Sequence, residues 1–110
     1  MTGVQTCALP ISLRRGEGAA LGNLGLVYAA LRETRKAIEF YEQHLAIARE
    51  IGDRRGEGNA LANMGNMLYG LGEKERGIQL MKQSLLIYEA IESPYQEQAR
   101  NILKGWGALG

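Results

Sequence analysis

Residues 14–53 read RRGEGAALGNLGLVYAALRETRKAIEFYEQHLAIAREIGD, and residues 54–93 repeat this stretch without a gap as RRGEGNALANMGNMLYGLGEKERGIQLMKQSLLIYEAIES. The two stretches have the same residue at 16 of 40 positions, and most of the other apolar positions stay apolar. Self-similarity at a fixed period of this length is typical of proteins built from stacked helical units. We therefore expect two copies of one structural unit, one after the other along the chain.

Each unit carries the pattern of two amphipathic helices, because apolar residues recur at spacings of three and four. The breaks fall at residues 32–34 and 72–73 within the units and at residues 52–53 between them, where Asp53 is a suitable N-cap. The predicted apolar stripes are Leu21, Leu24, Tyr28 and Leu31, then Ile38, Tyr41, Leu45 and Ala48, and in the second unit Leu61, Met64, Leu68 and Leu71, then Ile78, Met81, Leu85 and Tyr88.

A fifth helix is predicted over residues 93–106. Ser93 can cap it, Pro94 suits the first helical position because its missing N–H is not needed there, and Gln96 can complete a capping box. One apolar stripe follows, made of Ala99, Ile102, Leu103 and Trp106. We expect this helix to cover the C-terminal side of the repeat pair, with residues 107–110 as a glycine-rich tail.

Gly25 and Gly65 lie in the middle of predicted helices, where glycine costs about 1 kcal/mol relative to alanine. Some other requirement must therefore favour them. Ala37 and Gly77 are small residues at matching places on the facing helices. The four residues together predict that the two helix backbones of each hairpin approach closely.

These positions carry a resemblance to a known family. Leu24 and Gly25 followed by Tyr28, with Ala37 and Tyr41 on the second helix, resemble the signature of the tetratricopeptide repeat (TPR). The second unit is the looser copy, with a leucine in place of the tyrosine and otherwise Met64, Gly65, Gly77 and Met81 in register.

The period of 40 residues and the N-L-G core at residues 23–25 make the pair similar to the TPRs of Pins-type polarity adaptors, kinesin light chains and many bacterial signalling proteins. The resemblance implies an all-α fold, a right-handed superhelix of two helix-hairpin repeats over residues 13–53 and 54–92, closed by a capping helix over residues 93–106. It covers the chain from Arg14 to about Trp106.

The opening residues 1–11, MTGVQTCALPI, show no helical or strand period and resemble the translation of a standard sequencing-library adapter. We therefore interpret residues 1–12 as a non-native, adapter-derived segment. A short native N-terminal arm is the alternative. On the adapter interpretation Cys7 carries no functional information, and the parent protein extends further upstream.

The charges are balanced and interleaved, with 13 basic and 12 acidic residues and a net charge of +1. No stretch offers the concentrated positive field that nucleic acid or an anionic membrane requires. No apolar run approaches the roughly 18 residues of a membrane span. We expect a cytoplasmic protein that binds neither nucleic acid nor membrane.

The residues with chemically reactive side chains do not form a catalytic set. Gly16 and Gly18 superficially resemble a dinucleotide-binding loop, but they follow no strand, have the wrong spacing and recur in the second unit. His44 is the only histidine and lacks a second metal ligand or a nucleophile nearby, so a packed or partly exposed imidazole is expected. We predict a protein that is not an enzyme and holds no cofactor or metal.

Asn23 and Asn63 occupy equivalent places on the first helix of each unit, away from the apolar stripes. In TPR proteins the first helices line the concave groove, so the resemblance implies that both amides bind the backbone of an extended peptide. Helical spacing puts four more residues on the same face: Leu26, Asn59, Asn66 and Tyr69. The alternative is that these are merely solvated or helix-packing residues.

The leading hypothesis is a protein–protein interaction module that binds a peptide or helix of a partner in the concave groove. The alternative is a C-terminal regulatory or structural segment of a larger signalling or transcription-control protein, which packs on the other domains of that protein. We also expect the first helix to expose apolar surface around Leu21 and Val27, and the chain to self-associate through that face.

Overall fold

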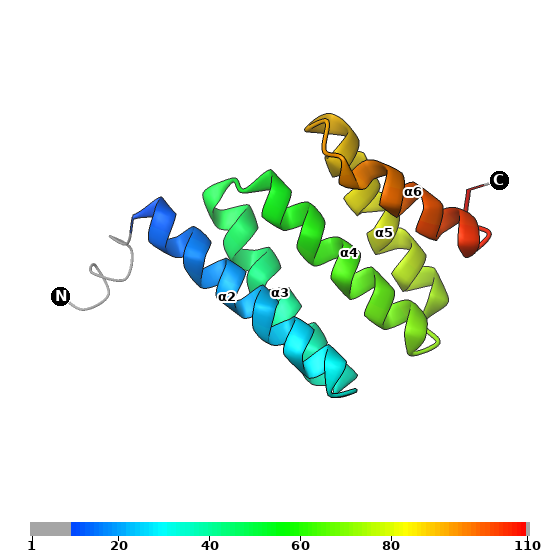
Figure 1. Cartoon of the computed structure of the whole chain (residues 1–110), viewed down its shortest axis with the longest axis horizontal. Coiled ribbons are helices and arrows are strands. Elements are labelled where there is room, and N and C mark those ends of the chain that lie inside the picture. Colours follow the sequence, from blue (N-terminus) through cyan, green and yellow to red (C-terminus); the bar gives the residue numbers. More distant parts are fainter. Residues whose placement is uncertain (1–9, 110) are drawn as a thin grey trace.

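The computed structural model describes residues 10–109, which form five helices and no strand (Figure 1). The helices are α2 (Ile11–Ala30), α3 (Thr34–Ile51), α4 (Arg54–Gly70), α5 (Lys74–Ala90) and α6 (Tyr95–Gly105). Each helix packs against the next one along the chain, so that α2 with α3 and α4 with α5 form two hairpins and α6 covers α5. The predicted all-α fold of two helix hairpins and a closing helix is confirmed.

The interpretation of residues 1–12 as adapter-derived falls mainly on residues 1–9, which lie outside the described part of the chain, as does residue 110 of the predicted tail. Helix α2 begins at Ile11, two residues before the expected start of the first unit at residue 13.

The turns between helices rest on residues in the left-handed backbone region. Gly52 ends α3 with φ 71°, and the Oδ1 atom of Asp53 then accepts a 3.0 Å hydrogen bond from the N–H of Gly56 at the start of α4. Within the hairpins, Arg32 (φ 64°) and Gly72 (φ 96°) occupy equivalent places. The predicted breaks and the Asp53 cap are therefore confirmed.

Helix α6 begins differently from the prediction. The Oγ atom of Ser93 accepts a 3.1 Å hydrogen bond from the N–H of Tyr95, so Ser93 does satisfy a backbone donor at this turn. Gln96 does not complete a capping box, since its Oε1 atom instead accepts from the Nη2 atom of Arg100 at 3.4 Å.

The core lies between neighbouring helices in two regions. The first is centred on Ala37 and Tyr41 of α3 packed against α4, and the second joins Met81 and Tyr88 of α5 to Leu103 of α6. In α6 the predicted stripe faces the core, with Ala99 and Leu103 buried and Ile102 and Trp106 partly buried against them.

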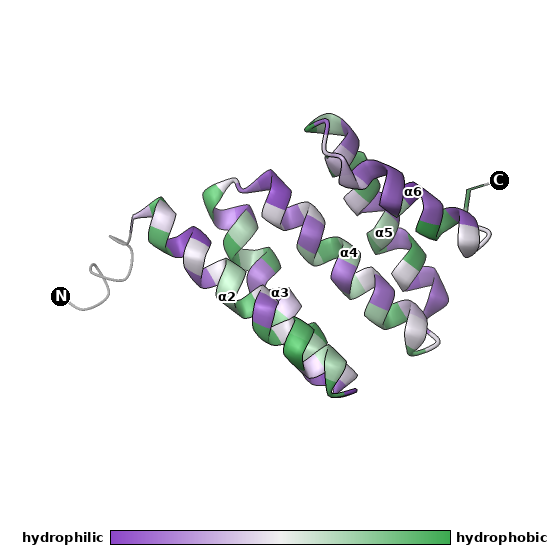
Figure 2. Ribbon diagram, in the orientation of Figure 1, coloured by the Kyte–Doolittle hydropathy of each residue, from purple (hydrophilic) through white to green (hydrophobic). Residues whose placement is uncertain are grey.

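The predicted apolar stripe of the first helix packs only in part: Leu21 and Tyr28 are partly buried, Tyr28 against the core, but Leu24 and Leu31 are exposed. The residues that α2 buries are the glycines Gly18, Gly22 and Gly25, whereas Leu24 is 42% exposed and Leu31 is 61% exposed. The equivalent of Leu24 in the second unit, Met64, is only 4% exposed because α4 lies between α3 and α5. In Figure 2 the ribbon of the C-terminal half of α2 is coloured mainly as hydrophobic.

The close approach of helices is confirmed in the second hairpin and takes another form in the first. A Cβ atom added at Gly65 would lie 2.9 Å from the carbonyl oxygen of Gly77, so only glycine allows the two backbones to meet. A Cβ atom at Gly25 would instead lie 2.5 Å from the Cε1 atom of Tyr41. In the first hairpin the glycine makes room for a buried aromatic ring.

Candidate binding groove

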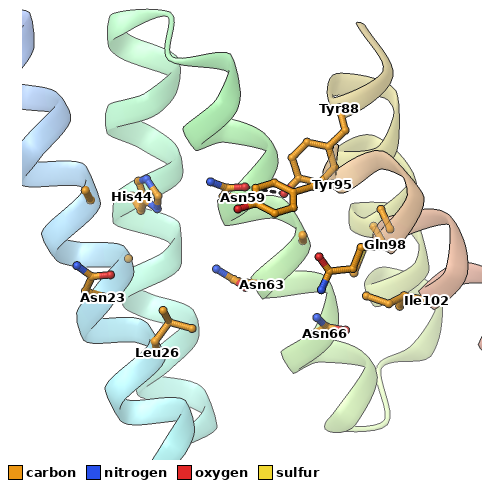
Figure 3. Close-up of a pocket in the computed structure, with 15 residues that line it drawn as sticks. Asn23, Leu26, His44, Asn59, Asn63, Asn66, Tyr88, Tyr95, Gln98 and Ile102 are labelled. Atoms are coloured by element: carbon orange, nitrogen blue, oxygen red, sulfur yellow. Dashed lines mark hydrogen bonds between the residues drawn. The ribbon is translucent and has the colours of Figure 1, made fainter. Parts of the chain in front are cut away.

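A cavity of about 350 Å³ opens between α2, α4 and α6, the first helix of each hairpin and the closing helix (Figure 3). Its volume lies in the lower part of the range that is typical of ligand sites. We call this cavity the groove. Helices α3 and α5 contribute to its walls through His44, Met81 and Tyr88.

Five of the six predicted site residues line the groove: Asn23, Leu26, Asn59, Asn63 and Asn66. Asn23 comes from α2 and its repeat equivalent Asn63 from the neighbouring α4, so the two amides face the same space (Figure 3). Gln98 of α6 adds a fifth amide on the opposite side. The repeat thus places the same side chain on successive helices of one surface.

The amide of Asn59 has a fixed orientation. The hydroxyl of Tyr88 donates a 2.6 Å hydrogen bond to the Oδ1 atom of Asn59. Burial raises the pKa of Tyr88, which keeps the hydroxyl protonated and able to donate. Because Oδ1 is occupied in this way, the Nδ2 atom of Asn59 is directed toward the groove (Figure 3).

His44 lies half-buried in the groove wall among glycines. A Cβ atom at Gly22 would lie 2.7 Å from the Nδ1 atom of His44, and one at Gly18 would lie 3.2 Å from its Cδ2 atom. Nδ1 is buried and has no hydrogen-bond partner among the described residues. Burial lowers the pKa of His44, against a smaller opposing effect of the Asp53 carboxylate. The lowered pKa therefore favours the neutral form of the imidazole near neutral pH.

The repeat equivalent of His44 behaves differently. Ser84 is fully buried, and its Oγ atom donates a 2.8 Å hydrogen bond to the carbonyl oxygen of Gly58. The small hydroxyl is satisfied within the second hairpin, whereas the imidazole in the first hairpin is not. The larger side chain at position 44 is accommodated because α2 carries glycines opposite it.

None of the described residues that line the groove is a lysine, arginine, aspartate or glutamate. Several charged residues that do not line the groove form ion pairs with one another. Arg14 forms ion pairs of 2.6 Å with both Glu17 and Glu50, and Arg49 lies 3.1 Å from Glu57. The hydrogen bond from Arg14 lowers the pKa of Glu50. The groove therefore offers neutral hydrogen-bonding groups on an apolar background.

Two further observations concern the described residues alone. Over residues 10–109 no three histidine, cysteine, aspartate or glutamate side chains gather in a way that could hold a metal ion. In the same part of the chain, no helix combines the length and the apolar character needed to cross a bilayer.

A comparison with protein families found a match to the family described as Tetratricopeptide repeat over residues 16–90. The chain belongs to the tetratricopeptide repeat family. A comparison with curated proteins found no match. TPRs generally act as non-catalytic scaffolds that bind other proteins, which agrees with the predicted class of function.

Tyr69 does not line the groove of this TPR pair. Its ring stacks on Trp106 of α6, with the ring centroids 4.0 Å apart and the planes at 4°, and the Nζ atom of Lys74 lies 5.7 Å from the ring centroid. Tyr69 thus belongs to the contact between α4 and α6. Helical spacing alone places it on the groove side, but the closing helix covers that end.

The sequence prediction missed the wall that α6 gives to the TPR groove. Tyr95, Gln98 and Ile102 line it, although α6 was expected only to cover the core. The 40-residue period does not reveal this wall, because it matches Asn63 with Leu103, which is fully buried. The usable signal is the helical spacing of Tyr95, Gln98 and Ile102, which puts them on one flank of α6.

Proposed function

We propose that this TPR pair binds an extended peptide segment of a partner protein in the groove. The observation that carries the proposal is the convergence of amide side chains from three helices: Asn23, Asn59, Asn63, Asn66 and Gln98. An amide side chain donates and accepts hydrogen bonds, as an extended peptide backbone also does. The groove therefore matches the backbone of such a ligand.

Asn23 and Asn63 are the central pair in this proposal. Asn23 is exposed and Asn63 is half-buried, so both amides remain open to a ligand. They come from equivalent positions on α2 and α4, and a ligand that crosses both helices meets the same group twice. Leu26 lies one helical turn beyond Asn23 and is 52% exposed, which provides apolar contact for a ligand side chain.

The test uses a displayed library of random peptides, from which binders to the full chain are selected. We expect Asn23→Ala combined with Asn63→Ala to weaken the selected peptides about 5- to 100-fold, since each lost hydrogen bond contributes about 0.5–1.5 kcal/mol. Asn101→Ala is the matched control, because Asn101 is exposed on α6 and does not line the groove.

Unchanged far-UV circular dichroism shows that the double variant keeps its helices. Retained affinity in that variant contradicts the proposed roles of Asn23 and Asn63. Failure of the library to yield any binder contradicts the peptide-binding function as a whole.

We also propose that the protein associates with a second copy of itself through the outer face of α2. Leu24, Val27 and Leu31 follow one another at spacings of three and four on this face and are exposed, as is Leu13 eleven residues before Leu24, whereas Leu21 is partly buried. No helix of the described chain covers them. A second copy offers the same stripe, and pairing two such helices removes both stripes from water.

A further inference from the structure

We propose that the groove selects an uncharged peptide segment and that Asn59, through its fixed Nδ2 atom, donates a hydrogen bond to a carbonyl oxygen of this segment. The inference rests on the proposed peptide-binding function and adds the chemical class of the ligand. Three features of the cavity carry it: its lack of charged side chains, the locked amide of Asn59, and apolar residues at one end.

The first step concerns charge. The only titratable side chains that line the groove within the described chain are those of His44, Tyr88 and Tyr95. Burial lowers the pKa of His44 and raises the pKa of Tyr88, which favours the neutral form of both side chains. A lysine, arginine, aspartate or glutamate of a ligand would lose hydration in the cavity without gaining an opposite charge. The groove thus disfavours ligands that place a charge inside it.

The second step concerns direction. The hydroxyl of Tyr88 occupies the Oδ1 atom of Asn59 at 2.6 Å, which leaves the two Nδ2 hydrogens for a ligand. Figure 3 shows the Nδ2 end of Asn59 directed toward the space between α4 and α2. Only an acceptor can satisfy these donors, and the acceptor that every residue of an uncharged peptide offers is its backbone carbonyl oxygen.

The third step concerns the opposite end of the groove. Leu26 of α2 and Ile102 of α6 line the cavity beyond the central amides (Figure 3). Leu26 is exposed in the free protein, so its burial against an apolar ligand side chain is favourable. An uncharged segment with an apolar residue at this end fits the whole length of the groove.

The first test examines the sequences that the full chain selects from the displayed random-peptide library. Enriched peptides should share a central segment without lysine, arginine, aspartate or glutamate. Enrichment of charged central segments overturns this inference but leaves the peptide-binding function intact. Absence of any enriched peptide overturns the function and the inference with it.

The second test measures the affinity of an enriched peptide at low and high salt. One exposed ionic contact contributes up to about fivefold in affinity, and salt screens it. We expect less than about a twofold change for a neutral groove. A loss of about fivefold or more at high salt shows that ionic contacts hold the ligand and overturns the inference.

The third test replaces the donor of Asn59 while keeping its shape. Asn59→Asp retains an oxygen for the Tyr88 hydroxyl but loses the Nδ2 donor, and the lost hydrogen bond should weaken peptide binding by about 2- to 10-fold or more. Asn101→Asp makes the same chemical change on the exposed side of α6, so it should leave the affinity unchanged. Equal affinities of the two variants overturn the role of Asn59.

Discussion

The close backbone contact between Gly65 and Gly77 predicts that alanine at position 65 destabilises the protein, whereas alanine at a mid-helix glycine with free space around it does not. Alanine at a mid-helix glycine normally stabilises a helix by about 1 kcal/mol. At Gly65 the added methyl group would lie 2.9 Å from the carbonyl oxygen of Gly77 and 3.2 Å from the backbone nitrogen of Met81. Both neighbours are backbone atoms, so α4 and α5 must move apart to accept it.

Overpacking of this kind costs about 1–3 kcal/mol, and a contact with rigid backbone favours the upper part of that range. Subtracting the gain in helix propensity leaves Gly65→Ala less stable than the parent by about 1–2 kcal/mol. For a domain of this size the melting temperature falls by about 4–8 °C for each kcal/mol.

Gly16→Ala is the matched control. Gly16 lies within α2, and no atom approaches the position of its Cβ within 4 Å, so the same substitution should stabilise the protein by about 0.5–1 kcal/mol. Thermal and urea unfolding followed by circular dichroism give both changes. If Gly65→Ala stabilises as much as Gly16→Ala does, the close approach of α4 and α5 is refuted.

Two further predictions concern His44 and the outer face of α2. Burial lowers the pKa of His44 in the folded protein. Below about pH 6.5 the unfolded chain therefore binds more protons at this residue than the folded protein does. The free energy of unfolding consequently falls as the pH drops from about 6.5 toward the lowered pKa. His44→Ser should reduce this slope in urea titrations between about pH 8 and pH 5, and an unchanged slope assigns it to other groups. Leu24→Gln with Leu31→Gln should shift the protein toward monomer in sedimentation velocity, whereas Leu86→Gln should not, because Leu86 is also exposed but lies on α5, away from that face. A monodisperse monomer of the parent at high concentration contradicts the self-association.

Most of the architecture follows from local signals in the sequence. The repeat, the helical spacing and the turn residues predict the five helices, because these features depend on the chain within a few residues of each position. The burial of α2 does not follow in this way. Leu24 and Met64 have the same place in the repeat, yet only Met64 is covered, since burial depends on which helices lie on both sides.

The sequence predicts the part of the candidate groove that α2 and α4 form, because these helices are equivalent in the repeat. It does not predict the part that α6 forms. Asn23 and Asn63 hold the same position in the repeat, so the assignment of one to the groove face of its helix also assigns the other. Gln98 belongs to α6, whose register against α5 is set by Leu103 and Trp106 rather than by the period. The stacking of Tyr69 on Trp106 likewise depends on where α6 lies, which helical spacing within α4 does not reveal.

Each of the two units has a non-glycine residue in the left-handed backbone region, but at a different turn. The first turns at Arg32 and ends at Gly52, whereas the second turns at Gly72 and ends at Glu92, whose φ is 55°. A non-glycine residue in the left-handed region costs about 1 kcal/mol or more, so each natural unit has one such penalty. A hybrid unit with the Gly72 turn and the Gly52 end has neither, and tandem copies of it should form a more stable array than copies of either parent.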